Sequence, residues 1–260
     1  MHKPLYDQIG RSYDMTRRAD PRIAKRIREL LDVRDSARVM DAACGTGNYT
    51  QALANTGLQM TGVDVSGTML DQAKEKFPEL TWEQADLSSM PFRSAQFDGA
   101  VCVLSIHHLP DLNAAFRTVH RVMKEGRFVI FTSSPEQMQT YWLYDYFPEM
   151  MKRSAEQMQS VEEVKSALVE AGFADVKQEP YFIDDDLEDF FLYSGKHEPE
   201  MYLDPTVRSG ISSFASLADE AEVKSGVEKL QGDIASGEIE NVMKRYASEA
   251  GDYVYITAVT

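Results

Sequence analysis

The sequence predicts an α/β fold built on a doubly wound sheet. Candidate strands and helices alternate as four consecutive strand–helix units within about 100 residues. Residues 97–104 form the most apolar run, which is typical of a strand that is covered on both faces. Right-handed connections between such strands place their carboxyl ends, and therefore a bound ligand, at one edge of the sheet.

The composition of each segment predicts the order of the elements. Strand-like segments cover residues 37–41, 59–64, 80–85, 97–104 and 127–132. Helical spacing of apolar residues predicts helices over 49–55, 67–77 and 111–126, the last of which should end at Gly126. Further along the chain we expect a helix over 161–171, an extended segment over 173–183 and a strand over 253–259.

The segments that flank this region differ in charge and in aromatic content. Residues 1–40 hold ten basic and six acidic side chains, and Ile23, Ile27, Leu30 and Leu31 follow one face of a helix. Residues 141–147 include five aromatic side chains, which either wall an apolar cavity or pack in an ordinary core. Residues 184–250 are acidic and helix-prone, and we expect them to form a cap.

Composition excludes several classes of protein. The chain has 260 residues, 43% of them hydrophobic and 27% charged, which is too apolar for a disordered protein. Its net charge of −15 argues against a nucleic-acid partner, because binding to phosphates needs a basic face. No apolar run is long enough to span a membrane or to form a signal peptide, so we expect a cytoplasmic protein. Cys44 and Cys102 lie in apolar stretches and indicate neither a disulfide nor a metal site.

Residues suited to a nucleotide-like ligand follow the first three predicted strands. Gly45 and Gly47 follow the first strand and let the backbone approach a ligand, although a glycine turn also serves tight packing. Asp64 ends the second strand, where a carboxylate can accept both hydroxyls of a ribose or can cap the next helix. Asp86 ends the third strand and can accept an adenine amino proton or cap the turn at 87–90.

Together these segments resemble the class I S-adenosylmethionine-dependent methyltransferases. Asp41–Gly47, an acidic residue followed by a Gly-x-Gly turn, is similar to the first motif of that family. The second motif, the third motif, the fourth strand and the turn before the fifth strand resemble residues 62–66, 85–92, 97–101 and 121–127. The resemblance covers residues 35–133 and is to the small-molecule group that includes the ubiquinone/menaquinone and trans-aconitate methyltransferases.

The resemblance implies a fold and a division of the chain. The fold is a Rossmann-like, seven-stranded, mostly parallel sheet with helical cap insertions. The parts are an N-terminal helical lid (1–35), a core that binds S-adenosylmethionine (36–134), an aromatic lid insertion (135–160), two segments that complete the sheet (161–183 and 251–260) and an acidic helical cap (184–250).

The resemblance also implies a site for S-adenosylmethionine, with S-adenosylhomocysteine as the product and no metal. The glycine turn would face the methionine part, Asp64 the ribose and Asp86 the adenine. Arg17 or Arg18 would pair with the methionine carboxylate or with an anionic substrate. The residues implied at the cofactor are Asp41, Ala42, Gly45, Gly47, Asp64, Val65, Met69, Asp86, Leu87, Leu104, Arg17 and Arg18.

Candidate catalytic residues come from two segments. His107 and His108 follow the fourth strand and are candidate general bases, of which we favour His108; a packing role at the pocket wall is the alternative. Tyr13, like Tyr6, lies in a segment that folds over the cofactor in relatives and could close over the reacting centre.

We therefore expect in-line transfer of a methyl group to an O, N, S or C atom of a small-molecule acceptor in a lidded pocket. One alternative is an RNA methyltransferase, which the negative charge disfavours. Another is a protein that binds S-adenosylmethionine without catalysing a reaction. A nicotinamide-dependent enzyme is disfavoured because Thr50 stands where the third glycine of its Gly-x-Gly-x-x-Gly motif would be.

Overall fold

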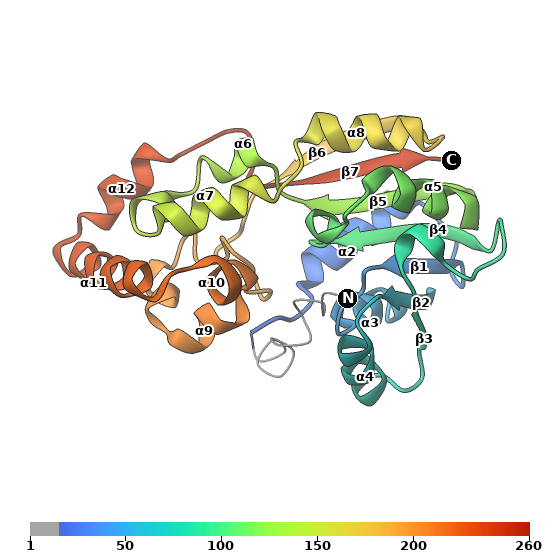
Figure 1. The fold of residues 1–260 in the computed structure, drawn as a ribbon, viewed down its shortest axis with the longest axis horizontal. Helices are drawn as coiled ribbons and strands as arrows, with labels where there is room; N and C mark the ends of the chain where they lie inside the picture. Colours follow the sequence, from blue (N-terminus) through green and yellow to red (C-terminus); the bar gives the residue numbers. More distant parts are fainter. Residues whose placement is uncertain (1–15) are drawn as a thin grey trace.

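The computed structural model describes residues 16–260, which form a seven-stranded sheet and a helical body beyond one end of it (Figure 1). The helical body comprises residues 135–158 and 184–250. The region predicted as an N-terminal lid, 1–35, is described only from Thr16 onward.

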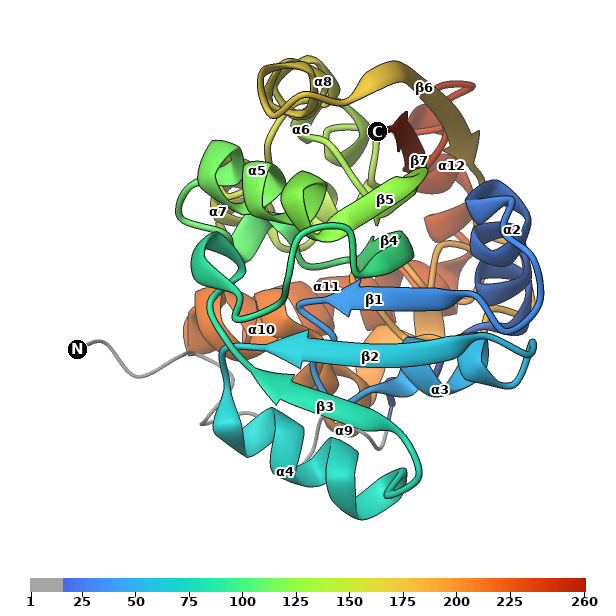
Figure 2. The same cartoon turned by 90° about the vertical axis from the view of Figure 1, so that its right-hand side faces the viewer.

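The sheet has the strand order β3-β2-β1-β4-β5-β7-β6 (Figure 2). Its strands are β1 (Arg38–Ala42), β2 (Gln59–Asp64), β3 (Thr81–Gln84), β4 (Phe97–Val103), β5 (Met123–Thr132), β6 (Ala174–Tyr181) and β7 (Tyr253–Val259). Strands β1 to β5 are parallel, and β7 runs antiparallel to both of its neighbours. The predicted doubly wound, mostly parallel sheet is confirmed. Its strand order reverses between β1 and β4, where open α/β sheets form their ligand crevice.

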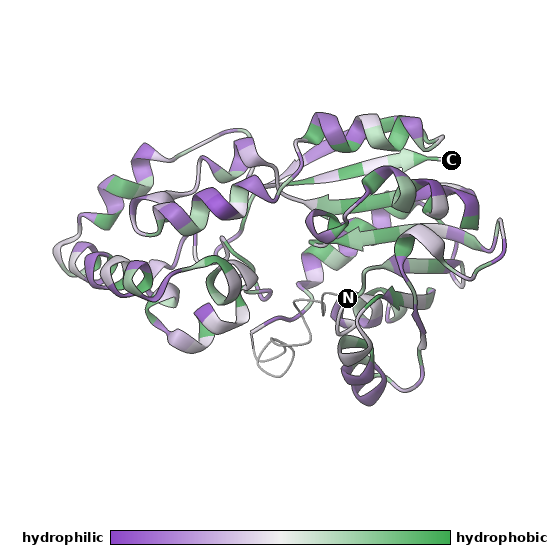
Figure 3. Cartoon of the chain, in the orientation of Figure 1, coloured by the Kyte–Doolittle hydropathy of each residue, from purple (hydrophilic) through white to green (hydrophobic). Residues whose placement is uncertain are grey.

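Helices cover both faces of this sheet. The helices α2 (Pro21–Leu31) and α3 (Asn48–Ala54) pack on one face, and α5 (Leu112–Val122) and α8 (Val161–Glu170) pack on the other. The helix α4 (Gly67–Lys76) lies against β2 and β3. Successive side chains of a strand alternate between the two cores, as the period of two requires. Figure 3 shows the hydrophobic residues concentrated in the central strands.

The first described helix, α2, begins and packs as its sequence predicts. Asp20 caps it, because Oδ1 of this buried side chain accepts hydrogen bonds from the backbone N–H groups of Arg22 and Ile23. Ile23 and Ile27 are fully buried, which confirms the predicted apolar face. This helix therefore anchors the preceding segment, which includes Arg17, to the sheet.

One predicted boundary is wrong. The helix expected to end at Gly126 ends at Val122, and β5 begins at the next residue. Met123 pairs with Phe97 of β4, so the backbone has already become extended there. Gly126 serves close packing of strands: a Cβ at this position would lie 2.2 Å from the backbone oxygen of Asp98.

The helical body is built around the aromatic segment. Its helices are α6 (Pro135–Met138), η3 (Trp142–Asp145), α7 (Pro148–Glu156), η4 (Pro199–Leu203), α9 (Pro205–Gly210), α10 (Ser212–Leu217), α11 (Glu220–Ser236) and α12 (Ile239–Arg245). Tyr141, Trp142, Tyr146 and Phe147 are at most 3% exposed. They pack in the core, and none of the four lines any of the three cavities described below. No helix of the described residues is long and apolar enough to cross a membrane.

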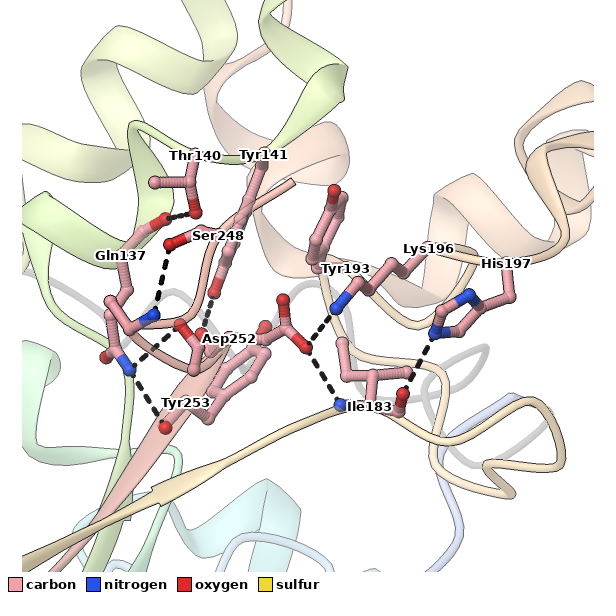
Figure 4. Close-up of polar contacts among 12 residues, drawn as sticks. Gln137, Thr140, Tyr141, Ile183, Tyr193, Lys196, His197, Ser248, Asp252 and Tyr253 are labelled. Atoms are coloured by element: carbon pink, nitrogen blue, oxygen red, sulfur yellow. Dashed lines mark hydrogen bonds and ion pairs between the residues drawn. The ribbon is translucent and has the colours of Figure 1, made fainter. Parts of the chain in front are cut away.

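A buried polar network around Asp252 joins the helical body to the sheet (Figure 4). The Asp252 carboxylate accepts hydrogen bonds from Lys196 Nζ at 2.7 Å and from the backbone N–H of Ile183 at 2.8 Å. The Tyr141 hydroxyl donates to the backbone oxygen of Asp252, and Gln137 Nε2 donates to that of Tyr253 at 2.9 Å. The start of β7 is thus fixed to both insertions that form the helical body.

We expect Lys196→Met to destabilise the protein by about 1–3 kcal/mol, because it leaves the buried carboxylate of Asp252 without its cation. The partial exposure of Lys196, 23%, keeps the effect below that of a fully buried pair. Chemical denaturation measures the change. Lys177→Met is the matched control, since the Lys177–Asp175 pair is exposed and should contribute less than about 0.5 kcal/mol. Equal effects of the two substitutions would contradict a structural role for the Asp252 network.

Candidate active site

The turn between β1 and α3 uses its two glycines differently. Gly45 and Gly47 have φ angles of +55° and +81°, which L side chains rarely adopt. A Cβ on Gly47 would lie 2.3 Å from the indole ring of Trp82, so tight packing requires glycine at this position. A Cβ on Gly45 would meet no atom within 4 Å. Gly45 therefore leaves open space at the edge of the sheet, where a ligand can approach the backbone.

Asp64 ties this turn to the end of β2. Its Oδ2 accepts a hydrogen bond from the backbone N–H of Gly45, and its Oδ1 accepts one from Ser66 N–H, both at 2.8 Å. The cap of α4 is Ser66, whose hydroxyl accepts from the backbone of Met69. Asp64 is therefore not the helix cap, and its carboxylate is held at the sheet edge.

Asp86 has the capping contact that the sequence left as an alternative. It precedes the short helix η1 (Leu87–Ser89), and its Oδ1 accepts hydrogen bonds from the backbone and the hydroxyl of Ser88. Both contacts use the same oxygen. Capping therefore remains compatible with a ligand contact at Oδ2.

A first cavity lies over these two carboxylates and holds about 740 Å³ of open space. Asp64 and Asp86 form its polar wall, and His108 also lines it. The other predicted cofactor residues in its lining are Gly45, Val65, Met69, Leu87 and Leu104. The structure thus brings together residues that come from the ends of four different strands.

A second cavity, of about 440 Å³, adjoins the first. The two share Ala43, Gly45 and Ser105 in their walls, so they follow one edge of the sheet. Of the predicted residues, Arg17, Arg18 and Asp41 line the second cavity. Ala42 and Gly47 line neither cavity; Ala42 is fully buried at the end of β1.

Asp41 is a buried carboxyl group in the wall of the second cavity. Thr50 Oγ1 donates a hydrogen bond to its Oδ2 at 2.6 Å. Burial, together with the nearby carboxylate of Asp64, raises the pKa of Asp41 to about 7 against the effect of the Thr50 hydrogen bond. Near neutral pH this group therefore exists in both protonation states.

Arg17 lies in a buried polar cluster that sequence reasoning missed. Its Nε donates to Asp189 Oδ1 at 2.5 Å, and Tyr49 donates to Asp189 Oδ2 at 3.1 Å. Burial raises the pKa of Asp189, although Arg17 and Tyr49 act in the opposite direction. Asp189 is 140 residues from Tyr49 in the chain, and no local pattern marks it as a partner. Arg18, in contrast, is exposed at the rim of the second cavity.

The two candidate histidines lie side by side on η2 (Ile106–His108) but face different cavities. Their ring centroids are 3.9 Å apart. His108 lines the first cavity, whereas His107 lines a third cavity of about 510 Å³ between the sheet and the helical body. Desolvation lowers the pKa of both imidazoles, so both are neutral at pH 7.

The third cavity meets the other two at single residues. It shares Leu104 with the first cavity and Arg17 with the second. Leu104 has a φ of +52°, and its backbone N–H donates to Phe131 O at 2.7 Å, which fixes the chain at this junction.

The predicted lid residues Tyr6 and Tyr13 lie outside the described residues. Within residues 16–260 no group of three or more His, Cys, Asp or Glu side chains could hold a metal ion.

We expect Asp41→Asn to change how stability depends on pH. The folded state of the wild type retains a proton on Asp41 up to about pH 7, whereas an ordinary Asp loses it near pH 4, so this contribution to stability is lost as pH rises through 7. Asn cannot ionise and can still accept the Thr50 hydrogen bond. Between pH 5 and pH 8 the free energy of unfolding of the wild type should fall by about 2 kcal/mol more than that of Asp41→Asn, as measured by chemical denaturation.

Asp71→Asn, which changes an exposed carboxylate on α4, is the control and should follow the wild-type curve. Identical pH dependence of the wild type and Asp41→Asn would show that Asp41 ionises as it does in the unfolded chain.

Comparison with known proteins identifies the family. Residues 40–131 match the family described as "Methyltransferase domain". The malonyl-[acyl-carrier protein] O-methyltransferase of Pseudescherichia vulneris is 30% identical over 128 residues, which are 49% of this chain and 51% of that relative. The chain thus spans about half of that protein. A demethylmenaquinone methyltransferase of Staphylococcus aureus is 30% identical over 180 residues, covering 59% of this chain and 74% of the relative.

Solved structures agree with this result. A putative methyltransferase from an antibiotic biosynthesis pathway of Anabaena variabilis superposes with a TM-score of 0.86 and 32% identity, over 94% of this chain and 99% of that one. The geranyl diphosphate C-methyltransferase of Streptomyces coelicolor has a TM-score of 0.56, with 92% of this chain and 75% of that one covered, and at 16% identity it supports the fold alone. The chain belongs to the class I S-adenosylmethionine-dependent methyltransferases, and S-adenosylmethionine is its cofactor.

Proposed function

We propose that this enzyme methylates a small molecule bound in the third cavity. The observation that carries the proposal is the meeting of three cavities around Leu104 and Arg17. Two of them follow the carboxyl edge of the sheet, and the third lies between the sheet and the helical body. A cavity between two parts of the protein fits a small acceptor better than an RNA, and the net charge of −15 also disfavours RNA.

The residues at the sheet edge fit a nucleoside joined to an amino acid. We assign the ribose hydroxyls to Asp64, whose carboxylate lines the first cavity at the end of β2 and is a hydrogen-bond acceptor. We assign the adenine edge to Asp86 and Leu87, with Val65 and Met69 as apolar walls. The open space at Gly45 supports close approach of the ligand to the backbone.

In the second cavity we assign the methionine carboxylate to Arg18. Arg17 and Arg18 both line this cavity, but Arg17 forms a buried ion pair with Asp189. Arg18 is exposed at the rim and can reach an anionic ligand group. Asp41 lies behind the turn and supports the loop through its bond with Thr50.

When bound, the cofactor supplies a methyl group on a positively charged sulfur, which is already activated for displacement. The protein then has mainly to align the acceptor, and such positioning contributes on the order of 7–11 kcal/mol. His107 is better placed than His108 to act as a general base, because it lines the third cavity. Its imidazole is neutral at pH 7 and can accept a proton.

We expect Asp64→Ala to weaken the binding of S-adenosylmethionine by more than tenfold, because the ribose loses its acceptor and Gly45 loses a bond that fixes the turn. Isothermal titration calorimetry gives the dissociation constants. Asp71→Ala, on the exposed side of α4, should bind like the wild type. Unchanged affinity in Asp64→Ala would exclude the ribose assignment. If the wild-type protein itself did not bind S-adenosylmethionine, the proposed function would be wrong.

We expect His107→Gln to lower turnover by about 10²–10⁴-fold while cofactor affinity stays within twofold of wild type. Turnover is measured as the rate at which S-adenosylhomocysteine forms from S-adenosylmethionine when a mixture of extracted metabolites supplies the acceptor. His120→Gln should turn over normally, because His120 lies on α5 and packs against Phe173, away from the three cavities. His108→Gln should instead raise KM for S-adenosylmethionine. Full turnover by His107→Gln would exclude His107 as the base.

A further inference from the structure

The third cavity combines walls from both parts of the protein. The sheet side contributes Leu104, His107, Ser133 and Tyr253. The helical body contributes Met138, Ser154, Met158, Phe191, Leu192, Ile211, Ser212 and Ser213. Apolar side chains, two of them flexible thioethers, therefore form much of the lining and can adapt to an apolar molecule.

The one charge in this lining is compensated within the protein. Among the described residues, Arg17 is the one charged side chain of the wall, and it forms an ion pair with Asp189, of which only 1% is exposed. Three of the four serine hydroxyls have partners within the protein: those of Ser154 and Ser213 lie 2.7 Å apart, and that of Ser133 contacts the Tyr141 hydroxyl at 2.9 Å. A charged acceptor would lose its hydration here without gaining a counter-ion.

One buried polar atom of a wall residue lacks a partner. Nδ1 of His107 is buried and has no hydrogen-bond partner among the described residues. A buried polar atom without a partner costs free energy, which a ligand can recover by pairing with it. In the tautomer with its proton on Nε2, this nitrogen accepts a hydrogen bond from a hydroxyl group.

From these observations we infer that the acceptor is an uncharged, partly apolar molecule that presents a phenolic or enolic hydroxyl to His107 Nδ1 as the group to be methylated. The inference rests on the proposed function and specifies its substrate class. The hydroxyl oxygen forms the new O–C bond as the S–C bond of the methyl donor breaks. The bonding pair stays on sulfur as a neutral thioether, and the hydroxyl proton passes to His107 and then to solvent.

Three phenols of similar size test the inference. They are 4-ethylphenol, which is neutral, 4-hydroxyphenylacetate, which is an anion, and tyramine, which is a cation. Isothermal titration into the full-length protein saturated with S-adenosylhomocysteine measures binding of each. We expect 4-ethylphenol to bind at least tenfold more tightly than either charged phenol, and to be O-methylated when S-adenosylmethionine replaces the product.

The outcomes separate this inference from the proposed function. No binding of S-adenosylhomocysteine would contradict the proposed function. If S-adenosylhomocysteine binds, but a charged phenol binds as well as 4-ethylphenol or none of the three binds, the inference is overturned.

A charge placed in the cavity provides a second test. Met158 is partly exposed in the lining, so Met158→Lys can be accommodated and should shift the preference by at least tenfold towards 4-hydroxyphenylacetate. Met243→Lys is the matched control, since Met243 is a half-buried methionine on α12 outside the cavity. If Met158→Lys left the order of affinities unchanged, the phenols would not occupy this cavity and the inference would be wrong.

Discussion

The carboxylate of Asp64 is the interaction on which the geometry of the site depends. Its two oxygens hold backbone N–H groups of Gly45 and Ser66, so one side chain at the end of β2 fixes both the glycine turn after β1 and the start of α4. The ring of Trp82 packs closely against the same turn at Gly47. The turn is therefore held in an open form by contacts within the protein, and a ligand would meet donors and acceptors that are already in place.

Much of the fold and of the lining of the first cavity could be predicted because both depend on local patterns. Strand composition and the residues that end each strand place Asp64, Asp86 and Gly45 at one edge, and the first cavity contains all three. The end of α5 was mispredicted because Gly126 approaches the backbone of Asp98, a contact that only strand pairing reveals. For the same reason Asp189 was missed, since its partners lie far away in the chain.

The placement of the two histidine rings shows a further limit of sequence reasoning. His107 and His108 are neighbours of one type, and the sequence offered no strong ground for choosing between them. The tight turn of η2 directs one ring to the first cavity and the other to the third. Backbone geometry after β4, where Leu104 adopts a positive φ, therefore decides which histidine faces the third cavity.

The helical body consists of two insertions in the chain, one between β5 and α8 and the other between β6 and β7. Both entry points lie at the antiparallel end of the sheet, and the strands that carry Asp64 and Asp86 lie at the opposite end. The two inserts can therefore be exchanged or reshaped in evolution without altering the strands that lead to Asp64 and Asp86, provided that the second insert keeps Asp189 as the partner of Arg17. A chimaera built on this principle would have to preserve the Asp252 junction, since it is there that the exchanged parts are fastened to the scaffold.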